Sequence, residues 1–502
     1  MTAPMNLTEL FADMDLAVPE LRIADITTHS QSARRGGLFL ACGGRRSHGL
    51  DFLPEVIAAE VAAIAWEPVD GRNGPELPAD IIGLCVPGLG ANLGLIADRF
   101  FARPSARLAV TGITGTNGKS TVAYLVAQAL NRLDQTAGYM GTLGYGIGTD
   151  LEASSLTTPG CVTVHRRLRE MADAGAGHVI MEVSSHALDQ QRVAGVRFRT
   201  AALTNVSRDH LDYHGSMESY AETKARLFTG TGIDTAVINI GDRYGAQLAG
   251  RLAKGRADGK SVQLITVALV NTDAEPDVRL IGHLQGACAD GIGLELGGDF
   301  GTATLDSSLW GRFNAENLIV ATGILLAVGC ELDAAVAALA ECVAPPGRMQ
   351  LIRGAAAGPT VIVDYAHTPD ALGKALEAVR EHTSGQVWCV FGCGGNRDRG
   401  KRSTMGAVAG ELADRSVVTD DNPRDEDPQA IIADIVAGLP DADDVDVIRD
   451  RADAIDFAIR SARADDTILI AGKGHEAWQL IGSDARAFSD AAAARAALGR
   501  MA

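Results

Sequence analysis

The sequence predicts an α/β protein of three domains: a small α/β domain at the N-terminus, a central domain built on a parallel sheet, and a C-terminal domain with a doubly wound sheet. Three observations predict this fold. A chain of 502 residues is too long for one ordinary hydrophobic core. Short apolar runs alternate with helical patterns, which favours parallel sheets covered by helices. Proline- and glycine-containing segments separate three blocks, residues 1–103, 104–343 and 344–502.

The first block holds two short strand-like runs with a helical pattern between them. The apolar runs at residues 38–41 and 81–86 have the length of strands. The apolar pattern from Phe52 to Ala65 predicts a helix. Arg103-Pro104-Ser105 then predicts a linker to the second block.

The central block places polar residues directly after its strand-like runs. Three such runs, at residues 108–110, 179–181 and 201–203, lead into a glycine-rich segment, into Glu182, and into the segment from Thr204 to His210. Ala344-Pro345-Pro346-Gly347 ends the block.

The third block repeats this arrangement four times. Buried parallel strands are predicted at residues 361–363, 387–391, 416–418 and 468–470, and Thr368 with Pro369 predicts a helix start after the first. Each strand leads into a polar motif, and ligands bind at the carboxyl ends of such strands. For one motif, ordinary turn chemistry would be the better explanation. Four motifs carrying Arg, Lys, His and Glu favour a single site on a Rossmann-like sheet.

Composition narrows the function further. The net charge of −18 argues against a general nucleic-acid binder, so any phosphate must be held by local devices such as helix N-termini. No apolar stretch is long enough to cross a bilayer, and the first residues lack the basic and apolar segments of a signal peptide. We therefore expect a cytoplasmic protein without membrane insertion. Eight scattered cysteines fit free thiols better than a metal site.

The run from Gly112 to Ser120 has the composition of a phosphate-binding loop. It lies between a predicted strand and an amphipathic helical pattern, which is the context that such a loop requires. Backbone N–H groups would hold phosphate oxygens, Lys119 would reach the terminal phosphates, and Ser120 can ligate Mg²⁺. The spacing departs from the common form, because Ile113 stands at the expected first glycine. We interpret the central block as a P-loop ATPase-like domain, with a plain glycine turn as the weaker alternative.

Glu182 and His210 both follow predicted strand ends and could complete a Mg²⁺ shell, since hard cations prefer oxygen ligands. Taken singly, Glu182 could equally well be a charged residue that is exposed to solvent at the end of a strand. His210 alone is equally well explained as a loop histidine.

Taken in order, the motifs resemble those of the Mur ligase family, whose ATP loop is shared with folylpolyglutamate synthetases. The resemblance is carried by residues 112–120, 181–186, 204–215, 220–224, 313–317, 347–349 and 364–369. It implies an ATP-dependent ligase that activates a carboxylate as an acyl phosphate and joins it to an amine. ATP and Mg²⁺ are the implied cofactors, and we expect a monomer.

The run Asp421-Asn422-Pro423-Arg424 resembles that of the family members that add meso-diaminopimelate to UDP-N-acetylmuramoyl-L-alanyl-D-glutamate in peptidoglycan synthesis. Lysine-adding members lack this arginine. Diaminopimelate differs from lysine by a distal carboxylate, which a guanidinium group can hold with two hydrogen bonds. The resemblance therefore implies these two substrates.

The resemblance also assigns residues to roles. The catalytic set is Lys119, Glu182, His210 and Lys224. The metal set is Ser120, Glu182, His210 and a carbamylated Lys224, because an unmodified ammonium group would repel the metal. The ATP-binding set is Gly115, Thr116, Asn117, Gly118, Lys119, Ser120, Thr121, Asn314, Arg348 and Asp364. The set for the UDP-muramoyl dipeptide is Thr28, Ser30, Arg45, Arg46, Ser47, Thr157, Thr158, Ser184, Gln190 and Arg192. The set for diaminopimelate is Arg397, Asp421, Asn422, Pro423, Arg424, Gly472 and Glu476.

The chain departs from the family pattern in two places: the family's Asp-Ser-Arg is His29-Ser30-Gln31, and Leu156 stands where a polar residue is usual. Three alternatives remain open. A folylpolyglutamate synthetase is disfavoured by residues 421–424 and 184–186. An NTPase switch or motor would leave the four motifs of the third block unexplained. A catalytically inactive nucleotide-binding protein would not need the catalytic set.

Overall fold

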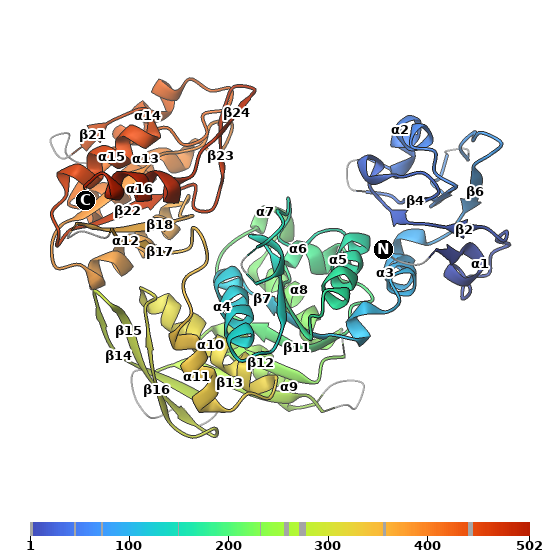
Figure 1. The fold of residues 1–502 in the computed structure, drawn as a ribbon, viewed down its shortest axis with the longest axis horizontal. Helices are drawn as coiled ribbons and strands as arrows, with labels where there is room; N and C mark the ends of the chain where they lie inside the picture. Colours follow the sequence, from blue (N-terminus) through green and yellow to red (C-terminus); the bar gives the residue numbers. More distant parts are fainter. Residues whose placement is uncertain are drawn as a thin grey trace. The chain divides into compact units, whose positions relative to one another are not determined.

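The computed structural model describes residues 4–44, 47–71, 74–148, 150–230, 232–255, 261–270, 278–354, 358–439 and 445–501. Figure 1 shows the helices and strands in chain order. The chain divides into two compact units. The first comprises residues 1–119, 130–238 and 242–264, and the second comprises residues 120–129, 239–241 and 265–502. The predicted domain boundaries after residues 103 and 343 stay predictions. None of the described helices is long and apolar enough to cross a membrane.

The first unit begins with a four-stranded parallel sheet in the order β3-β4-β5-β6. Its strands are β3 (Ile26–Thr27), β4 (Leu38–Ala41), β5 (Ala63–Trp66) and β6 (Ile82–Cys85). The side chains alternate between two small cores. Leu38 and Leu40 pack in the core that includes α1 (Leu7–Leu10) and α3 (Leu89–Phe100), whereas Phe39 packs in the core that includes α2 (Leu53–Ala58). A short antiparallel pair, β1 (Met5–Asn6) and β2 (Arg22–Ile23), precedes the sheet.

The helix predicted from Phe52 to Ala65 is wrong over its last part. Helix α2 ends at Ala58, Glu60 has a φ of +53°, and residues 63–66 form β5. Strand β5 pairs with β4 on one side and with β6 on the other. Backbone pairing on both edges of this apolar run outweighs its helical spacing, which is a weaker local preference.

The first unit continues with strands in the order β12-β11-β7-β10-β8-β9, parallel in every described pairing except that of β9 with β8. They are β7 (Ala109–Thr114), β8 (Ala137–Gly141), β9 (Gly144–Ile147), β10 (His178–Glu182), β11 (Phe198–Leu203) and β12 (Thr235–Asn239). The helices of this unit are α5 (Cys161–Asp173), α6 (Ser185–Asp189), α7 (Leu211–His214), α8 (Met217–Thr229) and α9 (Arg243–Ala253). Helix α4 (Lys119–Arg132) follows β7 in the chain, and its residues 120–129 are counted in the second unit. Because β7 pairs with both β10 and β11, the three polar segments predicted after these strands emerge side by side.

The second unit contains strands in the order β16-β15-β14-β13, followed by two helices. These elements are β13 (Gln263–Leu269), β14 (Leu280–Cys288), β15 (Gly291–Gly298), β16 (Ala303–Ser307), α10 (Arg312–Ala327) and α11 (Leu332–Ala340). Strands β14, β15 and β16 form an antiparallel meander.

The second unit also holds a six-stranded sheet in the order β17-β18-β22-β19-β20-β21, parallel except for β17. Its strands are β17 (Gln350–Ile352), β18 (Thr360–Asp364), β19 (Val387–Phe391), β20 (Arg415–Val418), β21 (Val445–Val447) and β22 (Thr467–Ala471). The helices are α12 (Pro369–His382), α13 (Gly400–Leu412), α14 (Pro428–Val436), α15 (Arg451–Ser461) and α16 (Asp490–Gly499). The predicted cap of α12 is present, because Thr368 accepts a hydrogen bond from the N–H of Ala371.

Both faces of this sheet are covered by helices. Alternate residues such as Ile362 and Leu469 pack with α12, α13 and α14, whereas Val361 and Ile468 pack with α15 and α16. The sheet is therefore doubly wound, as predicted. The four strands expected to carry the polar motifs are neighbours, so their motifs share one edge. A hairpin of β23 (Trp478–Ile481) and β24 (Asp484–Ala487) follows β22.

Candidate active site

The glycine-rich loop joins β7 to α4 and takes its shape from the segment after β11. Gly115 has a φ of +151°, and a Cβ atom there would lie 1.9 Å from Oγ1 of Thr204, so only glycine fits. The Thr204 hydroxyl donates a hydrogen bond of 2.6 Å to the carbonyl of Asn117, and the N–H of Asn117 donates to Oδ1 of Asn205 at 3.0 Å. Neighbouring strand ends therefore hold the loop open at the N-terminus of a helix, where anions bind.

Two lysine side chains converge on the carbonyls of this loop. Lys119 Nζ donates to the carbonyls of Gly115 at 3.0 Å and Thr116 at 2.8 Å, and Lys224 Nζ donates to that of Gly115 at 2.7 Å. Lys224 is only 2% exposed, and its Nζ lies 4.4 Å from the centre of the Tyr220 ring. The structure therefore brings two predicted catalytic cations together at the phosphate loop.

Burial lowers the pKa of Lys224 well below its usual value, and the positive charge of Lys119 lowers it further. The charge of Asp209 opposes this shift, but within the described residues Lys224 has no ion-pair partner. A buried ammonium group in this position gives up its proton more readily than a solvated one. The surroundings of Lys224 thus favour its neutral form.

Glu182 is held rigidly at the end of β10. Its carboxylate is 1% exposed, and Oε1 accepts hydrogen bonds from the Tyr139 hydroxyl at 2.5 Å and from the N–H of Thr142 at 2.8 Å. The Thr142 hydroxyl donates to Oε2 at 3.3 Å. Tyr139 and Thr142 were not among the predicted residues, because strand β8 carries no recognisable polar motif. Their effect is to fix the direction of a buried carboxylate.

Half of the residues predicted for the muramoyl dipeptide surround Glu182. The Thr158 hydroxyl donates to the Glu182 carbonyl at 2.8 Å and accepts from the N–H of Ser184 at 3.1 Å. Arg192 donates to the Thr158 carbonyl at 2.9 Å and to Oε1 of Gln190 at 2.6 Å. The Thr157 hydroxyl lies 2.9 Å from that of Thr142. Five predicted residues from separate parts of the sequence therefore form one connected group.

His210 lies at the N-terminus of α7 with a φ of +52°. Its ring packs edge-on against His186 with 4.8 Å between centroids, and Nε2 lies 3.5 Å from Oδ2 of Asp209. In the described ranges no three His, Cys, Asp or Glu side chains gather as a ready-made metal site. The carboxylate of Glu182 fits Mg²⁺, whereas the ammonium group of Lys224 does not unless it is modified. The predicted metal set, including Ser120 of the second unit, stays a prediction.

Of the remaining residues predicted for the dipeptide, Thr28, Ser30 and Ser47 lie in loops and a short turn beside the N-terminal sheet. The Ser30 hydroxyl donates to Oε2 of Glu55 at 2.7 Å, Thr28 is half-buried and Ser47 is exposed. Arg45 and Arg46 lie outside the described residues. Near Thr28 and Ser30 in the chain is a hollow of about 170 Å³, lined by Asp25, Thr27, His29, Ser32, Arg34, Tyr145, Val162, Thr163, Arg166, Arg167 and Glu170. No sequence pattern groups these residues, since they come from three separate segments.

The three nucleotide-binding residues predicted in the second unit have different surroundings. Arg348 and Asp364 come together through the pairing of β17 with β18: the N–H of Met349 donates to Oδ2 of Asp364 at 2.7 Å. Desolvation raises the pKa of Asp364, and the charge of Arg348 opposes that shift. The loop that precedes β17 contains Gly347, whose φ is +66°. It lies so close to the segment after β22 that a Cβ atom on Gly347 would be 2.1 Å from the backbone nitrogen of His475.

The third of these residues, Asn314, lies in the first turn of α10. Its Nδ2 donates to the carbonyl of Trp310 at 2.8 Å, and its Oδ1 accepts from Nδ2 of Asn317 at 3.0 Å. Asn317 was not among the predicted residues. Its three-residue spacing from Asn314 on a helix is the signal that indicates this contact.

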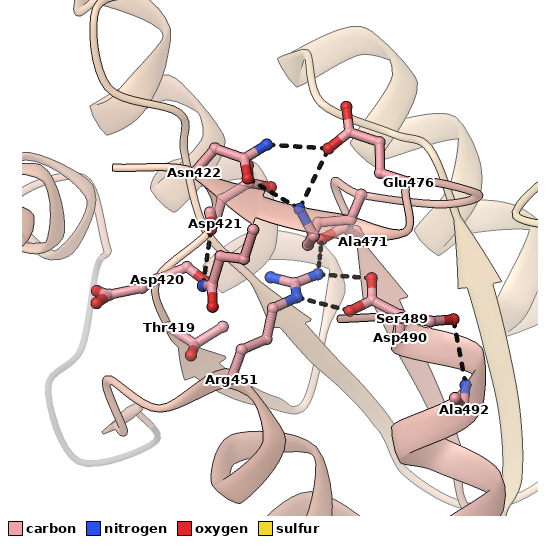
Figure 2. Close-up of polar contacts among 12 residues, drawn as sticks. Thr419, Asp420, Asp421, Asn422, Arg451, Ala471, Glu476, Ser489, Asp490 and Ala492 are labelled. Atoms are coloured by element: carbon pink, nitrogen blue, oxygen red, sulfur yellow. Dashed lines mark hydrogen bonds and ion pairs between the residues drawn. The ribbon is translucent and has the colours of Figure 1, made fainter. Parts of the chain in front are cut away.

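Most residues predicted for diaminopimelate gather after β20 and β22 (Figure 2). Asp421 and Asn422 are 9% and 5% exposed, and Nδ2 of Asn422 donates to Oε2 of Glu476 at 2.9 Å. Gly472 has a φ of +118°, and a Cβ atom there would lie 2.7 Å from Oδ2 of Asp421. Desolvation raises the pKa of Asp421, while the charges of Arg451 and Lys473 oppose the shift. Arg451 was not predicted to belong to the site, and Lys473 lies in one of the four predicted motifs but was not assigned to a substrate.

Arg424 is bound to the hairpin of β23 and β24 through its backbone. Its N–H donates to the carbonyl of Leu480 at 3.1 Å, and its carbonyl accepts from the N–H of Gly482 at 2.7 Å. Its guanidinium group donates to the carbonyl of Gly395 at 2.9 Å. Pro423 is buried, whereas Arg397 is exposed on the loop after β19. The Arg424 guanidinium group also lies 3.4 Å from the carbonyl of Asn422, so Arg424 is tied to both the loop after β19 and the loop after β20.

Comparison with known sequences identifies the same family that the motifs resemble. A sequence model described as the Mur ligase middle domain matches residues 113–325, and one described as the Mur ligase glutamate ligase domain matches residues 347–474. The UDP-N-acetylmuramoyl-L-alanyl-D-glutamate–2,6-diaminopimelate ligase of Alkalilimnicola ehrlichii is 46% identical over 485 residues, 95% of each chain. The protein of the same name from Pseudomonas aeruginosa is 45% identical over 99% of this chain and 98% of its own.

Solved structures of related proteins also resemble this chain. A structure of a UDP-N-acetylmuramoyl-L-alanyl-D-glutamate–2,6-diaminopimelate ligase matches with a TM-score of 0.71 and 32% identity over 99% of both chains. A folylpolyglutamate synthase of Mycobacterium tuberculosis, complexed with ADP and AMPPCP, has a TM-score of 0.59 at 21% identity, over 76% of this chain and 92% of its own. That second likeness is one of fold alone. The predicted α/β fold class is confirmed.

Proposed function

Because the chain belongs to the Mur ligase family, we propose that it joins meso-2,6-diaminopimelate to UDP-N-acetylmuramoyl-L-alanyl-D-glutamate in an ATP-dependent reaction. Relatives named for this reaction match almost the whole chain at 45–46% identity, which supports the proposal over a folylpolyglutamate synthetase. We further propose that the enzyme works in the cytoplasm, where ATP is available, and that it is a monomer.

The observation that carries the proposal is the group of charges after β20 and β22. Arg424, whose guanidinium group donates to the Gly395 carbonyl, would hold the distal carboxylate, and Asp421 and Glu476 would accept from the ammonium group. Diaminopimelate carries both groups at its distal carbon, whereas lysine carries only the amine. An unpaired guanidinium group in such a pocket disfavours lysine, because a charge left without its partner is costly.

The reaction needs two steps, because a carboxylate is a poor electrophile. An oxygen of the D-glutamyl γ-carboxylate attacks the γ-phosphorus of ATP, which forms an acyl phosphate and releases ADP. A neutral amine then attacks the acyl carbon, the C–O bond to phosphate breaks, and the amine proton leaves with the phosphate. The products are an amide, ADP and inorganic phosphate. The protein contributes alignment and charge neutralisation.

The residues of the phosphate loop would act on the first step. Lys119 would reach the terminal phosphates, and the backbone of Gly115 to Thr121 would hold their oxygens. Ser120, Glu182, His210 and carbamylated Lys224 would hold Mg²⁺, which when bound neutralises phosphate charge. Asn314, Arg348 and Asp364 would contact the rest of the nucleotide. Thr28, Ser30, Arg45, Arg46 and Ser47 would bind the uridine end, and the group around Glu182 would bind the dipeptide.

The environment of Lys224 supports its carbamylation. A carbamate forms when a neutral amine attacks CO₂: the C–N bond forms, one proton is lost, and a negatively charged carboxylate analogue results. Burial favours the neutral amine of Lys224. The modification would convert a cation that repels Mg²⁺ into an anionic oxygen ligand.

The proposal is tested by measuring ADP release with the UDP-muramoyl dipeptide and either meso-diaminopimelate or L-lysine. We expect strong dependence on diaminopimelate and little activity with lysine. Equal rates with both amines would contradict the assigned specificity, and ADP release without any amine would point to a simple NTPase.

Arg424→Ala should lower kcat/KM for diaminopimelate about 100-fold, with the KM for ATP nearly unchanged. Arg460→Ala, which removes an exposed arginine of α15, is the matched control and should leave both values as they are.

A further inference from the structure

We propose that Lys473 is a positioning residue that sets the affinity for the amine substrate by holding Asn422 and Glu476 in their binding orientation. This inference rests on the proposed function. Lys473 lies on the turn that follows β22, and its side chain is completely buried. It was not predicted as a site residue, although its neighbours Gly472 and Glu476 were.

The ammonium group of Lys473 uses its three N–H bonds on three acceptors from two loops. Nζ donates to Oδ1 of Asn422 at 3.0 Å, to Oε2 of Glu476 at 3.2 Å and to the carbonyl of Trp478 at 2.7 Å. These contacts tie the loop after β20 to the loop after β22. Because all three donors are used and the side chain is buried, Lys473 has no donor left for a substrate.

Lys473 fixes which way the Asn422 amide faces. Oδ1 of Asn422 accepts from Lys473 and also from the N–H of Leu480 at 3.0 Å, while Nδ2 donates to Oε2 of Glu476 at 2.9 Å. Flipping the amide would set its NH₂ group against two donors and its oxygen against a carboxylate. The side chain is therefore held in one orientation.

Glu476 is fixed through one of its two oxygens. Oε2 accepts from both Asn422 and Lys473, whereas the other oxygen points away from this network in Figure 2. The side chain of Glu476 is 35% exposed, so this second oxygen can meet a ligand. A carboxylate held in this manner presents one oxygen to an incoming ammonium group without having to be ordered on binding.

The backbone beneath Lys473 is itself anchored. Arg451, the first residue of α15, forms two hydrogen bonds of 2.7 and 2.8 Å with Asp490, the first residue of α16, and both side chains are 0% exposed. Arg451 also donates to the carbonyl of Ala471 at 3.0 Å, two residues before Lys473. Figure 2 shows Arg451 between Asp490 and Ala471. The end of β22 is thus a rigid support from which Lys473 holds Asn422 and Glu476.

The test compares Lys473→Met with Lys473→Gln in the full-length enzyme. Methionine has nearly the same length but no donor, whereas glutamine keeps two N–H donors. Both variants should fold, because Oδ1 of Asn422 keeps the N–H of Leu480 and Oε2 of Glu476 keeps Asn422. We expect the KM for diaminopimelate to rise about 10-fold or more in Lys473→Met and less in Lys473→Gln. The KM for ATP and kcat at saturating amine should change less than about twofold.

Two controls separate positioning from general weakening. Val379→Ala opens a cavity in the core against which α12 packs and lowers stability without removing a hydrogen bond of this network. Lys374→Met removes an exposed charge on the same helix. Neither should change the KM for diaminopimelate.

An unchanged KM in Lys473→Met, or an equal rise in KM with Val379→Ala, would overturn the inference. If wild-type enzyme shows no diaminopimelate-dependent ADP release, the proposed function itself fails. The two failures are therefore distinguishable.

Discussion

Two buried lysines, Lys224 and Lys473, have opposite surroundings. Lys473 donates to a carboxylate, an amide and a carbonyl, and all three N–H bonds are used. Lys224 donates to one carbonyl, lies over an aromatic ring, and lies close enough to Lys119 for that charge to lower its pKa. No described carboxylate forms an ion pair with Lys224, whereas Glu476 pairs with Lys473 at 3.2 Å.

The difference shows how a protein can use the same side chain in two ways. An ammonium group that is paired with a carboxylate, as in Lys473, stays charged and serves as a fixed cross-link between loops. A buried ammonium group without such a partner, as in Lys224, loses its proton more readily, and the neutral amine is the form that reacts with CO₂. We therefore assign Lys473 to positioning and Lys224 to chemistry.

The largest expected effect is the loss of activity in Lys224→Ala. If the carbamate holds the metal, removing it should reduce kcat about 1,000-fold or more. Small carboxylates such as acetate should restore part of the activity by filling the vacated space. The measurement is ADP release against acetate concentration, with Lys374→Ala as a control that should be active and insensitive to acetate. Full activity of Lys224→Ala without acetate would remove the distinction between the two lysines.

Arg451 extends the comparison to a second compensated cation. Arg451→Met leaves Asp490 buried without its partner and should destabilise the protein by about 3–5 kcal/mol. Adding Asp490→Leu removes the lone charge and should recover most of the loss. Thermal unfolding of the single and double variants measures the loss of stability in each. Equal destabilisation in both would mean that packing, rather than charge compensation, holds the end of β22.

Methionine at the two lysine positions should shift Tm in opposite directions. In CO₂-free buffer without nucleotide, Lys224→Met removes an uncompensated buried charge and should raise Tm, whereas Lys473→Met removes a cross-link and should lower it, each by roughly 2–4 °C. Calorimetric scans at one heating rate measure both shifts. Shifts of the same sign would show that burial alone determines the effect.

The smallest expected effect is a dependence of stability on pH. The pKa of Lys224 is lower in the folded protein than its ordinary value of 10.5, so the unfolded chain binds more protons between these two values. Stability should therefore rise with pH across that window. Lys224→Met should flatten this rise relative to wild type in Tm measurements from neutral pH to pH 10, and Lys374→Met should not. Parallel curves for wild type and Lys224→Met would contradict the lowered pKa.

Much of the fold was predictable because strand-like runs and helix starts are local features. The runs at residues 361–363, 387–391 and 468–470 became β18, β19 and β22, and each motif after them lies at the expected strand end. The helix predicted from Phe52 to Ala65 was wrong over its last part, because the local pattern does not show that residues 63–66 pair with strands on both sides.

The site was predictable where a motif carries its own chemistry, and less so where partners come from distant segments. The loop from Gly115 to Lys119 and the run from Asp421 to Arg424 were recognisable in this way. The partnership of Arg451 with Asp490, or of Thr142 with Glu182, spans about 40 residues with no periodic signal between them. Lys473 stood inside a recognised motif, but its burial and its three acceptors appear only in the folded chain.

The most direct measurement is ¹³C NMR of the purified enzyme equilibrated with ¹³C-labelled bicarbonate. Wild type and Lys473→Met should both show one carbamate resonance in slow exchange with free bicarbonate, and Lys224→Met should show none. Absence of the resonance from wild type, or its persistence in Lys224→Met, would contradict the account of these two lysines.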